Sequence, residues 1–144
     1  EKIITDFQEQ INVKKIKVSF KTSGDIPVIN MDKDRISSVI RTLLGNAIIY
    51  SPEGGEIEIF IKNEGENTRF SIKDNGIGIS KNDSPYIFSK FFRSHQATLT
   101  ETEGLGLSLF LIKSMVEKHE GEMGFESEGE NTGSRFWFIL PNNL

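Results

Sequence analysis

The stretch Lys73-Asp74-Asn75-Gly76-Ile77-Gly78-Ile79-Ser80 joins a segment of alternating polar and apolar residues, 68–72, to a long polar region. The alternation predicts a half-buried strand, so Asp74 stands where a strand ends. The two glycines that follow let the backbone adopt positive φ and come close to a ligand. Because an ionised carboxylate only accepts hydrogen bonds, the stretch suits an exocyclic amine such as the N6 group of adenine.

The same residues also fit a simple turn, because Asn75-Gly76 is typical of a two-residue hairpin connection. A hairpin needs a strand that returns, whereas the following Ser80-Lys81-Asn82-Asp83-Ser84-Pro85 lacks the pattern of a strand. The stretch by itself leaves both interpretations open, and the rest of the chain has to decide between them.

The clearest helical pattern lies upstream and begins after Asp32, a suitable N-cap. Its apolar residues recur at steps of three and four and form one face: Ile36, Val39, Ile40, Leu43, Leu44, Ala47 and Ile48. Thr42 and Asn46 fall one turn apart on the border of this face, with Ile49 and Tyr50 close by. Asn46 is therefore either a partly exposed helix residue or a side chain that lines a pocket beside the core.

The other periodic segments predict strands. Apolar and polar positions alternate in residues 15–21, 56–62, 69–73, 122–126 and 134–140. Short polar turns join the second segment to the third and the fourth to the fifth, which predicts two hairpins. The fold class that follows is α+β: a two-layer α/β sandwich with a mixed, mostly antiparallel sheet and helices on one face.

Residues 80–103 form a long polar excursion, and a segment of this length in a compact domain is typical of a lid, a binding loop or a disordered stretch. Within it, residues 86–92 predict a short aromatic helix. The motif at 104–107 then opens an apolar helix that runs through Lys118. Its two glycines either serve only to start the helix or expose unpaired N–H groups to an anion.

Length and composition restrict the class of protein. At 144 residues the chain is most simply one domain, and its net charge of −4 argues against binding nucleic acid. The absence of cysteine excludes thiolate metal sites and a cysteine nucleophile. No apolar run has the length of a membrane span and no signal peptide is visible. A cytoplasmic location is expected, with any membrane anchor in a longer parent protein.

From Lys15 to Pro141 the chain resembles the ATP-binding catalytic domain of sensor histidine kinases. The same superfamily contains DNA gyrase, the MutL mismatch-repair proteins and a heat-shock chaperone. Four motifs carry the resemblance in order: LLGNAIIYSP (43–52) resembles the N box, DNGIGI (74–79) the G1 box, IFSKFFR (87–93) the F box and GLGL (104–107) the G2 box. The resemblance implies the Bergerat-type fold, in which a lid covers ATP.

At the adenine end of the site, the resemblance implies that Asp74 accepts a hydrogen bond from the base amine and that Tyr50 lies against the base. The backbone that approaches the nucleotide would be that of Gly76, Ile77, Gly78 and Ile79.

At the phosphate end, the resemblance implies that Asn46 gives its side-chain oxygen to Mg²⁺, a cation that prefers oxygen ligands and shares them with phosphates. Lys90 and Arg93 would steady the terminal phosphates. The remaining residues implied to contact ATP come from the aromatic lid and the second glycine motif: Phe88, Phe92, Gly104, Leu105, Gly106 and Leu107.

The resemblance also implies partners. Residues 1–14 would be a linker or the end of an upstream helical dimerisation domain, and residues 15–144 the catalytic domain, itself monomeric. The domain would bind Mg-ATP, release ADP and donate the γ-phosphate to a histidine of the upstream domain, and the parent protein would serve a response regulator. His95 in the lid and His119 at a helix end do not lie on a phosphoacceptor helix, and we expect both at the surface.

Three positions depart from the residues usual in this family: Thr42, Ile49 and Glu103. Each change removes a polar contact or adds negative charge near a triphosphate. One alternative is therefore a degenerate signalling module that binds nucleotide weakly and docks partners. Another is a protein kinase or ATPase of the same superfamily, although threonine at position 42 cannot act as the general base that the hydrolytic members use.

Overall fold

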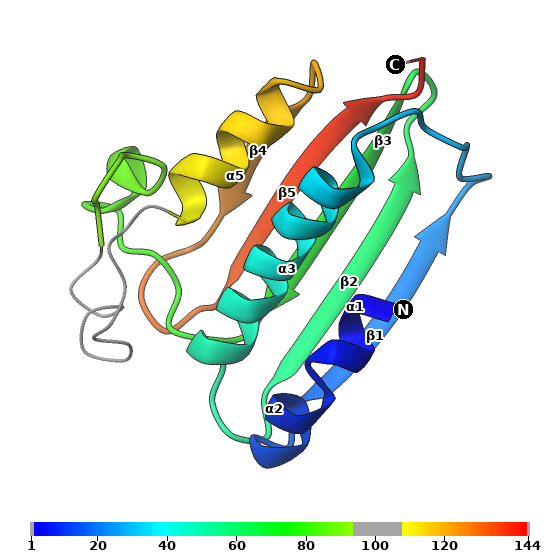
Figure 1. Cartoon of the computed structure of the whole chain (residues 1–144). Helices are drawn as coiled ribbons and strands as arrows, with labels where there is room; N and C mark the ends of the chain where they lie inside the picture. Colours follow the sequence, from blue (N-terminus) through cyan, green and yellow to red (C-terminus); the bar gives the residue numbers. More distant parts are fainter. Residues whose placement is uncertain (1, 94–107, 144) are drawn as a thin grey trace.

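The protein consists of a layer of helices on one face of a five-stranded sheet (Figure 1). The computed structural model describes residues 2–93 and 108–143. The helices are α1 (Lys2–Asp6), α2 (Gln8–Val13), α3 (Lys33–Tyr50) and α5 (Ser108–Glu117), and η1 (Ser84–Tyr86) is a single 3-10 turn. The strands are β1 (Lys17–Ser23), β2 (Glu56–Asn63), β3 (Asn67–Asp74), β4 (Glu122–Glu126) and β5 (Ser134–Pro141). None of these described helices combines the length and apolar character that crossing a bilayer requires.

The strand order in the sheet is β1-β2-β3-β5-β4. Strand β1 runs parallel to β2, and every other neighbouring pair is antiparallel. This confirms the predicted two-layer architecture with its mixed, mostly antiparallel sheet and its two hairpins. The second hairpin inserts β5 between β3 and β4, and the register then places Ser134 directly opposite Asp74.

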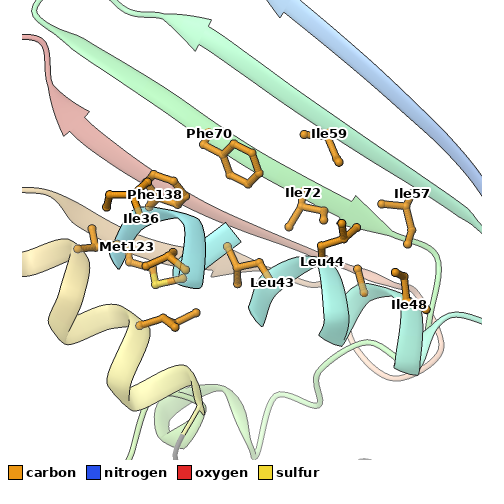
Figure 2. Close-up of a cluster of buried hydrophobic side chains, with 14 of the residues drawn as sticks. Ile36, Leu43, Leu44, Ile48, Ile57, Ile59, Phe70, Ile72, Met123 and Phe138 are labelled. Carbon is orange, nitrogen blue, oxygen red and sulfur yellow. The ribbon is translucent and has the colours of Figure 1, made fainter. Parts of the chain in front are cut away.

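Helix α3 supplies most of the helical side of the core. Its predicted N-cap is confirmed, because Asp32 Oδ1 accepts hydrogen bonds from the N–H groups of Asp34 at 3.1 Å and Arg35 at 3.0 Å. The apolar face packs on the sheet, where Leu44 is completely buried. Figure 2 shows this core, in which side chains of α3 meet side chains of four strands: Ile36, Leu43, Leu44, Ile48, Ile57, Ile59, Phe70, Ile72, Met123 and Phe138.

The first residues of the chain form two short helices, α1 and α2, that pack on this core. Ile11 is buried, and Ile3, Ile4 and Phe7 lie against the core while remaining half-exposed. These apolar contacts join residues 2–13 to the domain. The assignment of residues 1–14 to an upstream dimerisation domain or linker stays a prediction.

The short helix predicted at residues 86–92 is wrong. The segment contains the turn η1 followed by further turns, with hydrogen bonds from Ser89 N to the Tyr86 carbonyl at 2.8 Å and from Phe92 N to the Ser89 carbonyl at 3.3 Å. Phe91 has φ = +64°, which an α-helix cannot contain. The aromatic rings also have different partners, since Phe88 packs on Phe125 and Phe136 whereas Phe92 packs on Tyr86.

His119 is not simply a surface residue at a helix end. Its Nδ1 lies 2.7 Å from the Met115 carbonyl, and its Nε2 accepts a hydrogen bond from the Asp32 N–H at 3.1 Å. Nδ1 must therefore carry the proton, because Nε2 is the acceptor. The ring joins the end of α5 to the start of α3, which the sequence did not indicate.

Candidate functional site

Asp74 is a buried carboxylate at the end of β3, with 7% of its surface exposed. It lies opposite the core residue Ile57 on β2, and directly opposed residues share a face of the sheet, so the carboxylate points into the helical layer. Its Oδ1 accepts a hydrogen bond from Gly76 N at 2.8 Å, and its Oδ2 accepts one from Ser134 Oγ at 2.9 Å. The sequence predicts Ser134 only as part of the last strand and gives no sign of its contact with Asp74.

Burial raises the pKa of the Asp74 carboxyl above its ordinary value. The hydrogen bonds from Gly76 N–H and from the hydroxyl and N–H of Ser134 oppose this shift of the pKa without cancelling it. The site therefore keeps a carboxylate in surroundings that disfavour its charge. Such a perturbed group in a concave part of a fold is typical of a functional position.

This raised pKa predicts how stability depends on pH. At a pH between the pKa of Asp74 in the unfolded chain and its higher pKa in the folded protein, the folded protein holds a proton that the unfolded chain has released. The stability that the neutral carboxyl contributes is therefore complete below the unfolded pKa. It is lost as the pH rises through the folded pKa. We expect the free energy of unfolding of wild type to fall over this range relative to Asp74→Asn, which cannot ionise. Urea unfolding at several pH values measures the difference, with Asp25→Asn in an exposed loop as control. A difference that stays constant across this range contradicts the prediction.

The loop after Asp74 is held against the end of α3. Ile77 N donates a hydrogen bond to the Tyr50 carbonyl at 3.3 Å. The approach is so close that a Cβ on Gly76 would lie 2.3 Å from the same carbonyl oxygen. Glycine at position 76 is thus required by the packing of the loop on α3, and the Tyr50 carbonyl lies beside the Asp74 loop.

The β4–β5 loop supports the other side of the Asp74 loop. Asn131 N donates to the Ile77 carbonyl at 2.7 Å, and Gly133 N donates to the Gly76 carbonyl at 3.1 Å. The sequence indicated only a turn between two strands here. Contacts between segments more than fifty residues apart leave no local pattern by which they could have been found.

Two further positions fix the same pair of loops. Ser127 Oγ accepts from Ile79 N at 3.0 Å and donates to the Gly133 carbonyl at 2.8 Å. Gly78 has φ = +66°, and a Cβ there would lie 2.1 Å from the Gly129 carbonyl oxygen. The paired glycines are therefore explained by contacts within the protein, and Ser127 is a supporting residue that the sequence did not reveal.

Asn46 lies on α3 one turn before Tyr50 and is half-buried, as its border position predicted. The described part of the chain contains no group of three or more His, Cys, Asp or Glu side chains that could hold a metal ion. Asn46 with no such group beside it does not fit a metal ion whose ligands all come from the protein. It does fit Mg²⁺, which takes one or two protein oxygens and completes its shell with phosphates and water.

The aromatic segment is attached to the sheet and to α5. The Phe88 ring lies 5.8 Å from the Phe125 ring and 6.3 Å from the Phe136 ring, and Lys113 Nζ lies 4.9 Å from the centre of Phe88. Phe88 thus packs against the core. This packing holds the aromatic segment against the sheet and α5.

The two basic residues predicted on the lid side differ in exposure. Lys90 is exposed, and its Nζ lies 5.4 Å from the Phe91 ring centre and 5.8 Å from that of Phe110 at the start of α5. Arg93 is half-buried. The predicted residues Gly104, Leu105, Gly106 and Leu107, together with Glu103 and His95, lie outside the described residues.

The structure therefore brings together three of the predicted elements: Tyr50, Asp74 and the loop 76–79. A hollow of about 490 Å³ lies along β1 and β2 and extends to the end of β3, where Asp74 and Asn75 belong to its lining. Lys21 Nζ and Glu58 Oε2 pair across these strands at 2.6 Å, and this hydrogen bond lowers the pKa of Glu58. The hollow therefore reaches the end of β3 at which the candidate site lies.

Residues 31–144 match the family described as histidine kinase-, DNA gyrase B- and HSP90-like ATPases. The chain is 37% identical over 115 residues to the sensor histidine kinase WalK of Bacillus subtilis, covering 78% of this chain and 19% of WalK. It is 38% identical over 130 residues to the sensor protein KdpD of Clostridium acetobutylicum, covering 90% of this chain and 14% of KdpD. The chain thus spans less than a third of the length of these relatives.

Solved structures give the same result for the fold. The catalytic domain of histidine kinase ThkA superposes with a TM-score of 0.86 at 26% identity, covering 99% of this chain and 91% of that one. Full-length ShkA in complex with AMPPNP superposes with a TM-score of 0.81 at 25% identity, covering 97% of this chain and 28% of that one. ThkA in complex with the response regulator TrrA gives 0.79 at 28% identity, with 99% and 39% covered.

Proposed function

Because the chain belongs to the family of histidine kinase-, DNA gyrase B- and HSP90-like ATPases, with sensor histidine kinases as its relatives, we propose that it binds Mg-ATP for phosphotransfer. It would donate the γ-phosphate to a histidine on a separate dimerisation domain of its parent protein. The domain would act in the cytoplasm, where ATP is available, and on its own it would be a monomer.

The observation that carries the proposal is the buried Asp74 carboxylate. Two hydrogen bonds from Gly76 and Ser134 do not offset the cost of its burial, as its raised pKa indicates. The N6 amine of adenine would supply a further donor to this acceptor, and hydrogen bonds to a charged group are about twice as strong as neutral ones. Adenine binding thus gives a physical reason for keeping a carboxylate at position 74, where its burial costs free energy.

Tyr50 and the loop 76–79 would complete the adenine end. The Tyr50 carbonyl and the β4–β5 loop hold this loop from two sides by contacts within the protein. A loop that is already ordered loses less entropy when it binds a ligand. The contacts of Gly76 to Ile79 with the nucleotide are part of the proposal.

At the phosphate end, Asn46 would offer its side-chain oxygen to Mg²⁺. The ion, when bound, neutralises phosphate charge and fixes the orientation of the terminal phosphate. Lys90, whose side chain is exposed, and Arg93 would add positive charge on the lid side. Phe92 and residues 104–107 would line the same end of the pocket.

In the proposed transfer, an imidazole nitrogen of the acceptor histidine attacks the γ-phosphorus. The bond from phosphorus to the β,γ-bridging oxygen breaks, ADP leaves with the electron pair, and the imidazole releases its N–H proton to solvent. Such a transfer depends on positioning and charge neutralisation. The transfer needs no general base at position 42. Hydrolysis by an ATPase that activates water from this position would need one, and Thr42 cannot act as that base.

The acceptor would have to come from outside this chain. His119 is engaged with the Asp32 N–H and the Met115 carbonyl, which makes it unsuitable as a phosphoacceptor. The relatives whose names describe sensor kinases are several times longer than this chain. The parent protein would therefore supply the histidine, and a response regulator would be its partner.

A calorimetric titration with a nonhydrolysable ATP analogue and Mg²⁺ tests this function. We expect saturable binding of one nucleotide, and no phosphorylation of the isolated chain when it is incubated with labelled ATP. The second candidate is a docking module, favoured by the hydrophobic Ile49, which is 36% exposed beside the proposed site. Failure to saturate at millimolar analogue would favour that candidate and contradict ATP binding.

A further inference from the structure

Each of the last four carbonyl groups of α3 has a hydrogen-bond partner. The last four carbonyls of a helix have no partner within it; here they belong to Ala47, Ile48, Ile49 and Tyr50. The Ala47 carbonyl accepts from Ser51 N at 3.1 Å, and the Tyr50 carbonyl accepts from Ile77 N at 3.3 Å. The other two must be satisfied from elsewhere.

Lys14 satisfies them. Its Nζ lies 2.8 Å from the Ile48 carbonyl oxygen, 2.7 Å from that of Ile49 and 2.9 Å from that of Ser51. An ammonium group has three N–H donors, and each has a carbonyl partner here. A cation at this end of α3 also interacts favourably with the helix dipole.

The backbone of Lys14 is attached to the same region. Its carbonyl accepts a hydrogen bond from Gly54 N at 2.7 Å, in the loop between α3 and β2. Lys14 is also the C-cap of α2. The position of its ammonium is therefore set by the end of α2 on one side and by the α3–β2 loop on the other.

These contacts reach the proposed nucleotide site through a single residue. Tyr50 lies between Ile49 and Ser51, both of which give their carbonyls to Lys14. Fixing the peptide groups on both sides fixes the direction of the Tyr50 carbonyl between them. That carbonyl in turn holds Ile77 N and abuts Gly76.

We propose that Lys14 is a positioning residue for nucleotide binding, because its ammonium orients the Tyr50 carbonyl that holds the Asp74 loop. It contacts no nucleotide itself. The expected effect of Lys14 on nucleotide affinity rests on the proposed function, whereas its expected effect on the order of the Asp74 loop does not. Through Lys14, the end of α2 would help to set the shape of the nucleotide pocket.

The test compares Lys14→Met, which keeps the length of the side chain without its donors, with Lys15→Met as a matched control. Lys15 Nζ pairs with Glu53 Oε1 at 2.8 Å, but both side chains are largely exposed, so little should depend on them. Backbone amide exchange is measured at Ile77 and, as an internal reference, at Ile72 in the buried strand β3. Nucleotide affinity is measured by calorimetry with the same analogue.

For Lys14→Met we expect exchange at Ile77 to accelerate about tenfold more than at Ile72, and the Kd for the analogue to rise about tenfold. Lys15→Met should change neither value. Parallel acceleration at Ile77 and Ile72 would show a loss of overall stability only and would overturn the proposal, as would unchanged exchange at Ile77. If wild type itself binds no analogue, the proposed function fails while the exchange comparison still decides the role of Lys14.

Discussion

Replacing Asp74 with alanine should weaken the binding of Mg-ATP by about 1–3 kcal/mol, the range for a lost hydrogen bond to a charged group. The carboxylate would accept from the adenine amine, and alanine offers that amine no partner. The donors of Gly76 and Ser134, which now serve Asp74, would also lose their acceptor. Calorimetry on the folded variant measures the change in affinity.

The matched control is Asp25→Ala, because Asp25 is exposed and follows β1 at the opposite end of the sheet. It removes the same charge from the protein and should leave the affinity for Mg-ATP unchanged. An unaltered affinity in a folded Asp74→Ala variant would remove Asp74 from the site. An equal loss in both variants would mean that net charge, and not the adenine contact, sets the affinity.

Gly78→Ala should destabilise the fold by about 2–4 kcal/mol, since it combines backbone strain with overpacking. The residue has φ = +66°, and the new Cβ would lie 2.1 Å from the Gly129 carbonyl oxygen. The β4–β5 loop would have to move, and the hydrogen bonds that it makes with the Asp74 loop would be disturbed. Urea unfolding measures the loss, and nucleotide affinity should fall with it.

Gly54→Ala separates the effect of backbone strain from that of overpacking. Gly54 has a similar φ of +73°, but a Cβ there would meet nothing within 4 Å. Its cost should therefore be about 1 kcal/mol, from the backbone conformation alone. If Gly78→Ala were no more destabilising than Gly54→Ala, the close packing of the two loops would be wrong.

Local patterns in the sequence were sufficient for α3 and the hairpins. The Asp32 cap and the apolar face of α3 act within a few residues of each other, so their signals survive in the sequence. The side-by-side order of β3 and β5 was not predictable in this way. It depends on which faces can be buried together, and the contact between Asp74 and Ser134 spans 60 residues.

Two other features show why local patterns fail. Hydrophobic spacing in the aromatic segment suggested a helix, whereas Phe88 and Phe92 turn to separate partners and Phe91 has positive φ. A lone Lys14 in a polar segment gave no sign that it would meet three carbonyls more than thirty residues away. Polar residues that act through distant backbone atoms carry no periodicity.

Comparing the affinities for ATP and inosine triphosphate tests whether Asp74 recognises the amine of adenine. The two bases differ at position 6, where inosine has a carbonyl in place of the amine, and at N1, which carries a proton in inosine. Calorimetric titration with Mg²⁺ should show ATP binding at least about tenfold more tightly, since the inosine carbonyl would face a carboxylate that can only accept. Equal affinities for the two nucleotides would show that Asp74 does not recognise the amine.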